Sequence, residues 1–435
     1  MPLPTPERPR LRFELEPRRP ARGKRLALLV AAAVVLLAAI GAALPAEPPK
    51  SLPPPPPPPG PAEIDSLALL RQATKGPDGK LRATLPDGRV ATLSIDSALQ
   101  LQVEKLLAAR PVPYGVSVAV EPSTGRILAL VEHSRAAPEE APGLAGRPLS
   151  PAASVFKVVT AAALLEQGVP AGETVCFHGG KHRIRPVHLQ DSSRDRRCLS
   201  LAQAMGHSAN VAFAKLADRK LTPALLRDEA EKLLFNTPIS VDGSVLEASP
   251  ALIPEEPFDF ATTAAGFSPE VRLTPLHGAV LAAAVANDGV AMPLTLIDDL
   301  DGLPVERRPG QRLMTPEVAA DLAAMLELTV KEGTARKAFR NRRLPAFAAA
   351  AAGKTGSLHE QEPFRDHTWF VGYAPAEAPE VAVSTVIVNE GIWHVKAPHV
   401  ARETLRLALV AGEAREKAAS REAGPGTGHG NAAPE

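Results

Sequence analysis

The sequence lacks a marked net charge and several motifs on which common functions depend. Its 435 residues carry a formal net charge of only +1, so neither basic nor acidic excess favours binding to nucleic acid or to an acidic partner. It contains no His-Glu-x-x-His motif, which excludes a zinc peptidase of that type, and no Gly-x-x-x-x-Gly-Lys phosphate loop. It also has no internal repeat. We therefore expect no nucleic-acid partner and no cofactor.

Apolar residues are unevenly distributed, and this indicates a membrane anchor. Residues 1–25 hold a cluster of arginines and lysines, and residues 26–44 then run without a charge. A helix of this length spans roughly 28 Å, about the thickness of a bilayer core. The basic side of such a span stays in the cytoplasm, so the remaining chain is expected outside. A cleaved signal peptide is the alternative, and it would export the same residues.

The segments around the expected domain are short or poor in apolar residues. The proline-rich residues 45–61 predict a stiff polyproline II spacer. Residues 62–87 alternate short polar and apolar stretches that are too few for a core of their own, and they predict a connecting region. The C-terminal residues 417–435 end in a tail without apolar content and are expected to be disordered.

Cysteine is scarce, with only Cys176 and Cys198 in the whole sequence. Both lie in the part expected outside the cytoplasm, where a disulfide between them is the natural prediction. Three histidines, at 178, 182 and 188, share the same polar stretch, so a metal site is an alternative. The spacing matches no closed structural zinc pattern. Free thiols are the third possibility.

From residue 88 to 416 the pattern predicts one α+β domain. Two early strands form a hairpin over 114–132, three strands follow late in the sequence, and helices dominate between them. We expect strands at 89–95, 352–358, 367–374 and 380–388, and helices at 97–107, 154–166, 199–219, 223–235, 275–287, 316–331 and 399–416. The early and late strands are expected to form one antiparallel sheet, flanked by helices and by a mainly helical subdomain.

Ser154 and Lys157 begin an apolar helix and are three residues apart, so they share a helix face. A serine needs a base to become a nucleophile, and a lysine with a lowered pKa in a dry site is such a base. By itself this pair is also consistent with an ordinary helix cap followed by a solvated lysine.

Two further clusters favour the reactive interpretation. Ser208 and Asn210 offer a hydroxyl and an amide at another helix start, although a capping serine would look the same. Lys354, Thr355, Gly356 and Ser357 stand on an expected strand, where small residues let an extended substrate approach and the amine and hydroxyls can hold a carboxylate. Three such motifs in this order rarely coincide.

With these motifs the sequence resembles the penicillin-binding protein transpeptidases of the penicilloyl serine transferase superfamily, most closely the monofunctional class B branch. The resemblance implies that Ser154 is acylated by peptidoglycan stem peptides or by β-lactam antibiotics, with Lys157 as base. It implies that Ser208 passes a proton to the leaving amine with help from Lys354. Asn210 would bind the substrate amide and Thr355 and Ser357 its carboxylate, while backbone N–H groups of Ser154 and Ser357 would form the oxyanion hole.

The resemblance further implies a single-pass protein of the bacterial inner membrane whose catalytic domain lies in the periplasm or otherwise outside the membrane. A membrane-embedded glycan polymerase is a possible partner. The sequence departs from the family in two places. Gly266 to Ser268 replace the usual Gly-Gln-Gly segment, and about 25 residues stand where class B members carry a pedestal domain.

Several alternatives remain open at this point. A D,D-carboxypeptidase would use the same motifs with water as acceptor. A non-catalytic β-lactam-binding scaffold of the cell wall, or a β-lactam sensor, would use the fold without turnover. A serine β-lactamase needs a deacylating base, and the nearest match to a Glu-x-x-Leu-Asn element, residues 231–236, is one residue too long.

Overall fold

The computed structural model describes residues 65–135, 137–180, 183–340 and 350–422. They belong to a unit that runs from Ala62 to Glu435. The expected membrane span at 26–44 and the spacer at 45–61 lie outside the described residues, as does the tail beyond Glu422. Among the described helices, none has the length and apolar character needed to cross a membrane.

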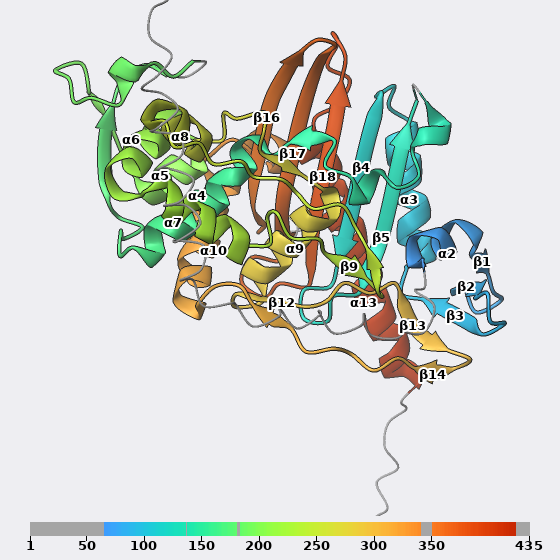
Figure 1. The fold of residues 1–435 in the computed structure, drawn as a ribbon. Helices are drawn as coiled ribbons and strands as arrows, with labels where there is room; N and C mark the ends of the chain where they lie inside the picture. Colours follow the sequence, from blue (N-terminus) through green and yellow to red (C-terminus); the bar gives the residue numbers. More distant parts are fainter. Residues whose placement is uncertain (1–64, 136, 181–182, 341–349, 423–435) are drawn as a thin grey trace, which may run out of the picture. The chain divides into compact units, whose positions relative to one another are not determined.

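A five-stranded antiparallel sheet forms the centre of this unit, with the strand order β16-β17-β18-β4-β5 (Figure 1). The strands are β4 (Tyr114–Val120), β5 (Ile127–Ser134), β16 (Ala352–Gln361), β17 (Phe364–Ala374) and β18 (Val381–Asn389). Strands from the two ends of the domain meet where Val386 of β18 pairs with Val116 of β4. The predicted α+β fold, with one sheet completed by early and late strands, is therefore confirmed.

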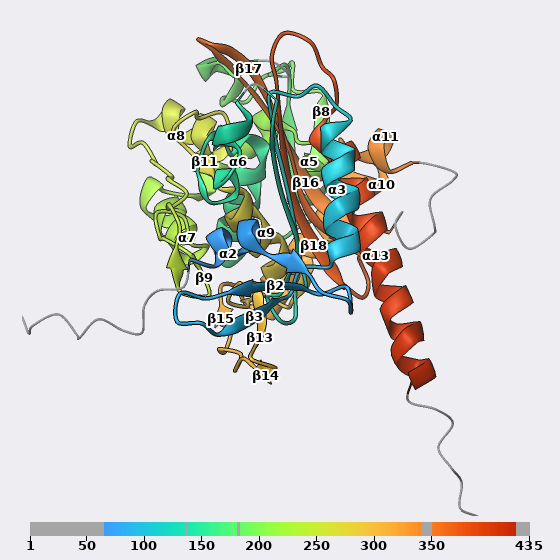
Figure 2. The same ribbon diagram turned by 90° about the vertical axis from the view of Figure 1, so that its right-hand side faces the viewer.

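Helices cover both faces of this sheet, because its inner strands are apolar on both sides. All nine residues of β18 are buried, as expected for a strand without a solvent face. In Figure 2, α3 (Ser97–Ala108) and α13 (Ala397–Glu422) lie on one face, and α9 (Pro275–Ala286) packs on the other. The predicted last helix is too short, since α13 continues to Glu422 through residues that favour helix.

The helical part of the domain stands beside the edge strand β16 (Figure 1). It contains α4 (Lys157–Glu166), α5 (Leu201–Gly206), α6 (Asn210–Lys220), α7 (Pro223–Lys232), α8 (Pro257–Ala264) and α10 (Pro316–Lys331), and the short α11 (Arg336–Phe339) follows α10. The prediction of one continuous helix over 199–219 is wrong. The chain breaks after Gly206, and Ser208 takes a φ of +52° before α6 starts.

The break after α5 has a packing cause. Gly206 lies so close to α10 that a Cβ on it would stand 2.9 Å from the Cβ of Leu328. The backbone oxygen of Gly206 also accepts a hydrogen bond of 3.2 Å from the N–H of Thr334. A helical pattern in the sequence cannot register this close approach, because the contact comes from residues more than a hundred positions away.

A second five-stranded sheet, with the order β1-β2-β3-β13-β14, was not anticipated from the sequence. Its strands are β1 (Thr74–Lys75), β2 (Leu81–Thr84), β3 (Val90–Leu93), β13 (Ile297–Leu300) and β14 (Leu303–Pro304). The stretch 62–87, expected to be a connecting region, thus contributes two strands and α2 (Ser66–Gln72). Leu69, Ala83 and Leu85 of this stretch are buried in the main apolar core.

Short paired strands and single 3₁₀ turns complete the described chain. The pairs are β6 (Ser150–Pro151) with β11 (Arg272–Leu273), β7 (Thr174–Phe177) with β8 (Arg197–Ser200), β9 (Ser240–Val241) with β10 (Ser244–Val245), and β12 (Val290–Ala291) with β15 (Gln311–Arg312). The 3₁₀ turns are η1 (Pro138–Glu140), η2 (Leu144–Gly146), η3 (Ala153–Phe156) and η4 (Pro186–His188).

The two cysteines face each other across the β7–β8 pair and form a disulfide. No group of potential metal ligands occurs in the described part of the chain. Instead, His178 is hydrogen-bonded through Nδ1 to Asp195, 2.5 Å away, and Asp195 in turn accepts 2.7 Å from the buried Lys215. The polar stretch in which a metal site was the alternative is therefore organised by the disulfide and by the ion pair between Lys215 and Asp195.

Replacement of both cysteines by alanine is expected to destabilise the domain by about 3 kcal/mol, because the bond closes a loop of about 22 residues in the unfolded chain. Chemical unfolding of residues 62–435 would measure the change. The unmodified protein with reductant serves as control and should show the same loss. A change below about 0.5 kcal/mol in both would contradict a stabilising bond.

Candidate active site

Ser154 lies in the 3₁₀ turn η3, directly before α4 begins at Lys157. The turn starts from an unusual backbone, since Ala153 has a φ of +49°. Two glycines come close to it: a Cβ on Gly266 would stand 2.4 Å from the Ala153 oxygen, and a Cβ on Gly356 would stand 3.2 Å from the Ala152 oxygen. The close packing of these two segments holds the turn in place. The helix-cap interpretation of Ser154 is not what the structure shows, because neither η3 nor α4 has a side-chain cap.

Lys157 is fully buried, and its ammonium nitrogen has three oxygen partners. The Nζ atom is hydrogen-bonded to Ser154 Oγ at 2.8 Å, and it donates to Asn210 Oδ1 at 2.9 Å and to the Ala265 oxygen at 2.6 Å. When Lys157 is neutral, these two donated hydrogen bonds use both of its protons and its lone pair faces the Ser154 hydroxyl. None of the three oxygen partners is a carboxylate that would compensate a positive charge. Burial therefore lowers the pKa of Lys157 well below its usual value, and the nearby charge of Lys354 lowers it further.

Lys354 is also fully buried, on β16. Its Nζ donates to Ser208 Oγ at 2.9 Å and to the Thr355 oxygen at 3.0 Å. Burial lowers the pKa of Lys354 to about 7, so near neutral pH it is able both to give and to take a proton. The structure thus brings together two serine–lysine pairs from separate parts of the sequence, and Asn210 joins the first of them.

The residues after Lys354 follow the free edge of the sheet. Because β16 is the end strand, its outer side has no strand partner among the described residues. Gly356 is buried against the turn that carries Ser154, Thr355 is half-buried, and Ser357 is exposed. An extended peptide is able to pair with such an edge while hydroxyls bind its terminus. Thr355, Gly356 and Ser357 thus lie on the free edge strand, and their binding of a substrate carboxylate stays a prediction.

Thr334 belongs to this site although sequence reasoning did not single it out. Its Oγ1 lies 2.5 Å from Thr355 Oγ1, and its backbone N–H is held by Gly206. It stands directly after α10, where Gly333 packs so closely that a Cβ would lie 1.9 Å from the Gly206 oxygen. No local signal marks Thr334, because its position follows from contacts between distant segments.

The departure at Gly266–Ser268 begins directly against the turn that carries Ser154. Gly266 has a φ of +73° and touches the backbone of Ala153 and Ser154, while the carbonyl before it accepts from Lys157. The β-lactamase alternative gains no support. Asn236 uses both atoms of its amide on the backbone of Ala251, at 2.8 and 3.2 Å, and Glu231 is exposed on α7.

The fold and the two serine–lysine pairs define a class of domain that known proteins share. Residues 115–406 match the family model described as the penicillin-binding protein transpeptidase domain. The chain therefore belongs to the penicillin-binding protein transpeptidase family, and the family resemblance inferred from the three motifs is confirmed.

Individual relatives point to the same family. Peptidoglycan D,D-transpeptidase PbpA of Mycobacterium tuberculosis (strain CDC 1551 / Oshkosh) is 31% identical over 313 residues, covering 63% of this chain and 62% of that protein. PbpA of Mycolicibacterium smegmatis is 30% identical over 322 residues, covering 64% and 62%. The chain thus spans less than two thirds of the length of these relatives.

A solved structure of penicillin-binding protein A from M. tuberculosis, an imipenem acyl-enzyme complex, aligns with a TM-score of 0.58. The two sequences are 26% identical, and the alignment covers 74% of this chain and 80% of that one.

The rate of acylation by a β-lactam is expected to be bell-shaped in pH. It falls in acid as Lys157 gains a proton, and it falls again above about pH 7 as Lys354 loses the proton it shares with Ser208. Stopped-flow measurement of the second-order acylation constant across the pH range would record both the acid and the alkaline limb of this profile. Lys354→Arg should move the alkaline limb upward, because arginine stays protonated.

The matched control for that profile is Lys337→Arg, which changes an exposed lysine. It should leave both limbs in place. An unchanged alkaline limb in Lys354→Arg would show that another group titrates there.

Thr334→Val is expected to lower the second-order acylation constant about tenfold, the equivalent of about 1.4 kcal/mol for a lost hydrogen bond. The reason is that Thr355 Oγ1 loses the partner that orients it. Thr334→Ser keeps the hydroxyl and should retain the rate. Thr334 would have a purely structural role if the acylation constant fell equally in both variants. The same would follow if Thr334→Val alone lost thermal stability in proportion to its loss of acylation rate.

Proposed function

We propose that this protein is a membrane-anchored serine D,D-transpeptidase that cross-links peptidoglycan stem peptides through an acyl-enzyme on Ser154. The observation that carries the proposal is the 2.8 Å hydrogen bond between Ser154 Oγ and a buried lysine whose pKa is lowered. Membership in the transpeptidase family supports it. The PbpA relatives are themselves named peptidoglycan D,D-transpeptidases.

In the acylation step, neutral Lys157 takes the proton from Ser154 Oγ as that oxygen attacks the carbonyl carbon of the penultimate D-alanine. The tetrahedral oxyanion is stabilised by backbone N–H groups of Ser154 and Ser357, a donor pair of the kind worth about 3 kcal/mol per donor. The carbon–nitrogen bond then breaks. Ser208 delivers a proton to the departing D-alanine amine and is itself reprotonated from Lys354, its partner at 2.9 Å.

In the second step, the amine of an acceptor stem peptide attacks the ester carbonyl and displaces Ser154 Oγ. Lys157 returns its proton to that oxygen, and the acceptor amine gives its proton through Ser208 to Lys354, so both lysines regain their starting protonation states and the serine is free. Before acylation, Lys354, Thr355 and Ser357 hold the terminal carboxylate of the donor, and Asn210 binds the substrate amide. A β-lactam imitates the donor dipeptide and forms the same ester, as imipenem does in the M. tuberculosis relative's acyl-enzyme structure.

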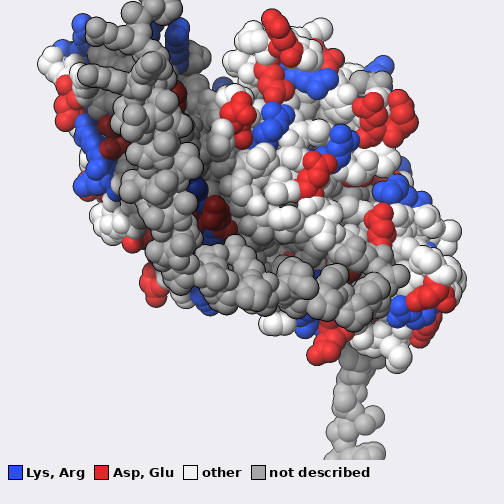
Figure 3. Space-filling view, in the orientation of Figure 1, with Lys and Arg blue, Asp and Glu red and all other residues white. Residues whose placement is uncertain are grey.

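The cellular setting is part of the proposal. The uncharged run at 26–44 after a basic stretch supports a single span in the bacterial inner membrane with the catalytic domain outside. Both signs of charge are interspersed on the face shown in Figure 3, which gives no support for a nucleic-acid partner. We further propose peptidoglycan and β-lactams as ligands, and a membrane-embedded glycan polymerase as the partner that supplies nascent strands.

A fluorescent penicillin should label residues 62–435 covalently at one site, and Ser154→Ala should abolish the label because no other oxygen is activated by Lys157. Lys157→Met should lower the labelling rate about 10²–10⁴-fold, the usual contribution of a general base. Intact-protein mass spectrometry and gel fluorescence would measure both. Ser123→Ala, in the exposed β4–β5 turn, is the control and should label normally.

An unlabelled native domain would contradict the acyl-enzyme. With a stem pentapeptide as donor and a D-amino acid as acceptor, chromatography should show the exchanged amide as the main product. Hydrolysis alone would identify a D,D-carboxypeptidase, rapid loss of the penicillin label a β-lactamase, and labelling without any product a β-lactam-binding scaffold.

A further inference from the structure

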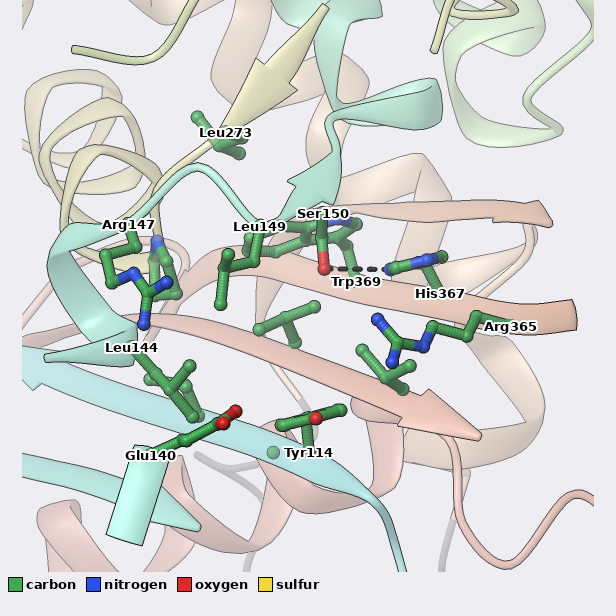
Figure 4. Close-up of a pocket in the computed structure, with 15 residues that line it drawn as sticks. Tyr114, Glu140, Leu144, Arg147, Leu149, Ser150, Leu273, Arg365, His367 and Trp369 are labelled. Carbon is green, nitrogen blue, oxygen red and sulfur yellow. Dashed lines mark hydrogen bonds between the residues drawn. The ribbon is translucent and has the colours of Figure 1, made fainter. Parts of the chain in front are cut away.

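We propose that a cavity next to β6, the strand that leads to Ser154, binds a small apolar carboxylate and thereby alters acylation at Ser154. The cavity has a volume of about 270 Å³ and lies between β4, β17, β18 and the chain that approaches β6 (Figure 4). None of Ser154, Lys157, Ser208, Asn210 or Lys354 lines it. It is therefore a different site from the catalytic cleft.

The walls of the cavity are mostly apolar and come from rigid elements. Trp369 of β17 and Val386 and Val388 of β18 form the sheet side, and Leu144 and Leu273 stand on other sides. The volume is close to the lower end of the range for ligand pockets, about 300–1,000 Å³. Such a space fits one aromatic ring or a short branched chain better than a long lipid tail.

Two arginines give the cavity its preference for an anion. Figure 4 shows Arg147 and Arg365 on opposite sides, with the guanidinium of Arg365 directed toward the centre of the view. Arg365 stacks on Tyr114, with Cζ 5.2 Å from the ring centroid, yet its Nε is buried without a hydrogen-bond acceptor. The side chain as a whole is about one third exposed, and the Glu390 carboxylate 3.5 Å from Nε makes an ion pair without a hydrogen bond. A ligand carboxylate is able to supply that hydrogen bond, because it binds a guanidinium through two parallel N–H donors.

The carboxylates nearest to the two arginines lie too far away for good hydrogen bonds. Glu390 Oε1 lies 3.5 Å from Arg365 Nε, and Glu247 lies 3.9 Å from Arg147 with both side chains largely exposed. Glu140 is the one acidic residue among those lining the cavity. His367, also in the lining, has its pKa lowered by burial. Glu390 and Glu247 do not line the cavity, so within the lining itself two arginines stand against one glutamate, and a ligand with a single carboxylate matches that lining.

The cavity is connected to the nucleophile through two side chains. Trp369 lines the cavity and donates its Nε1–H to the oxygen of Pro151 at 2.8 Å. His367 Nδ1 is hydrogen-bonded to Ser150 Oγ at 2.8 Å, and Ser150 itself lines the cavity (Figure 4). Ser150 and Pro151 form β6, and Ser154 follows three residues after Pro151. A ligand in contact with Trp369 and Ser150 is thus able to shift β6, the strand that leads to Ser154.

Phenylacetate is a suitable probe, because it joins one ring to one carboxylate. The protein has two tryptophans, so Trp393→Phe leaves Trp369 as the only one and lets its fluorescence report occupancy. We expect saturable quenching by phenylacetate and at least about tenfold weaker binding of the neutral phenylacetamide. Arg365→Leu should reduce phenylacetate binding to the level of the amide, while Arg227→Leu, which changes an arginine on α7, should have no effect.

Two measurements separate this cavity from the catalytic cleft. Quenching should persist after Ser154 has been acylated by penicillin, and it should be lost in Leu144→Phe or Val388→Phe, which fill the cavity. Loss of quenching on acylation, or retention in both filled variants that still fold by circular dichroism, would overturn the binding site.

The effect on acylation rests on the proposed function and has its own readout. Saturating phenylacetate should change the second-order penicillin constant about threefold or more in the unmodified protein and not in the filled variants. Quenching without a change in the penicillin acylation constant would contradict the effect on acylation and leave the binding site standing. Quenching in a protein that penicillin never labels would leave the binding site standing and overturn the proposed function.

Discussion

The burial of two lysine amines is the constraint on which the rest of this structure depends. An ammonium ion removed from water is costly unless a carboxylate accompanies it, and the three oxygens around Lys157 are a hydroxyl, an amide and a backbone carbonyl. The amine therefore favours its neutral form, which is the form that accepts a serine proton. Lys354 is held in the same way, with a pKa of about 7. Reactivity here follows from desolvation.

Close backbone approaches supply the geometry for that desolvation. Gly266 and Gly356 bring two segments against the turn that carries Ser154, and Gly206 lets α5 end against α10 so that Ser208 leaves the helical path. Each of these contacts joins residues distant in sequence. The site is thus assembled where the edge strand β16 meets the helical part, and a side chain at any of these glycines would push the packed segments apart.

Regular periodicity and short motifs are local signals. They were sufficient to predict the antiparallel sheet and to single out the residues around Ser154 and Lys354. Contacts between distant segments leave no such trace. The break before Ser208 follows from packing on Leu328, and the place of Thr334 beside Thr355 follows from the same α5–α10 contact. The strands within residues 62–87 are two to four residues long, too short for an alternating pattern. They are stabilised by pairing, since β2 pairs with β3 and β3 pairs with the distant strand β13.

The same burial that makes the lysines reactive also weakens the fold near neutral pH. A lysine whose folded pKa lies below its unfolded value of 10.5 must release its proton to fold, so unfolding takes up protons between those two values. Stability from these residues therefore rises with pH over that interval and is lowest below the folded pKa. The large apolar core around α4 and the central sheet has to offset this deficit. The buried amines are best explained by catalysis, because a purely structural core would be more stable with apolar side chains in their place.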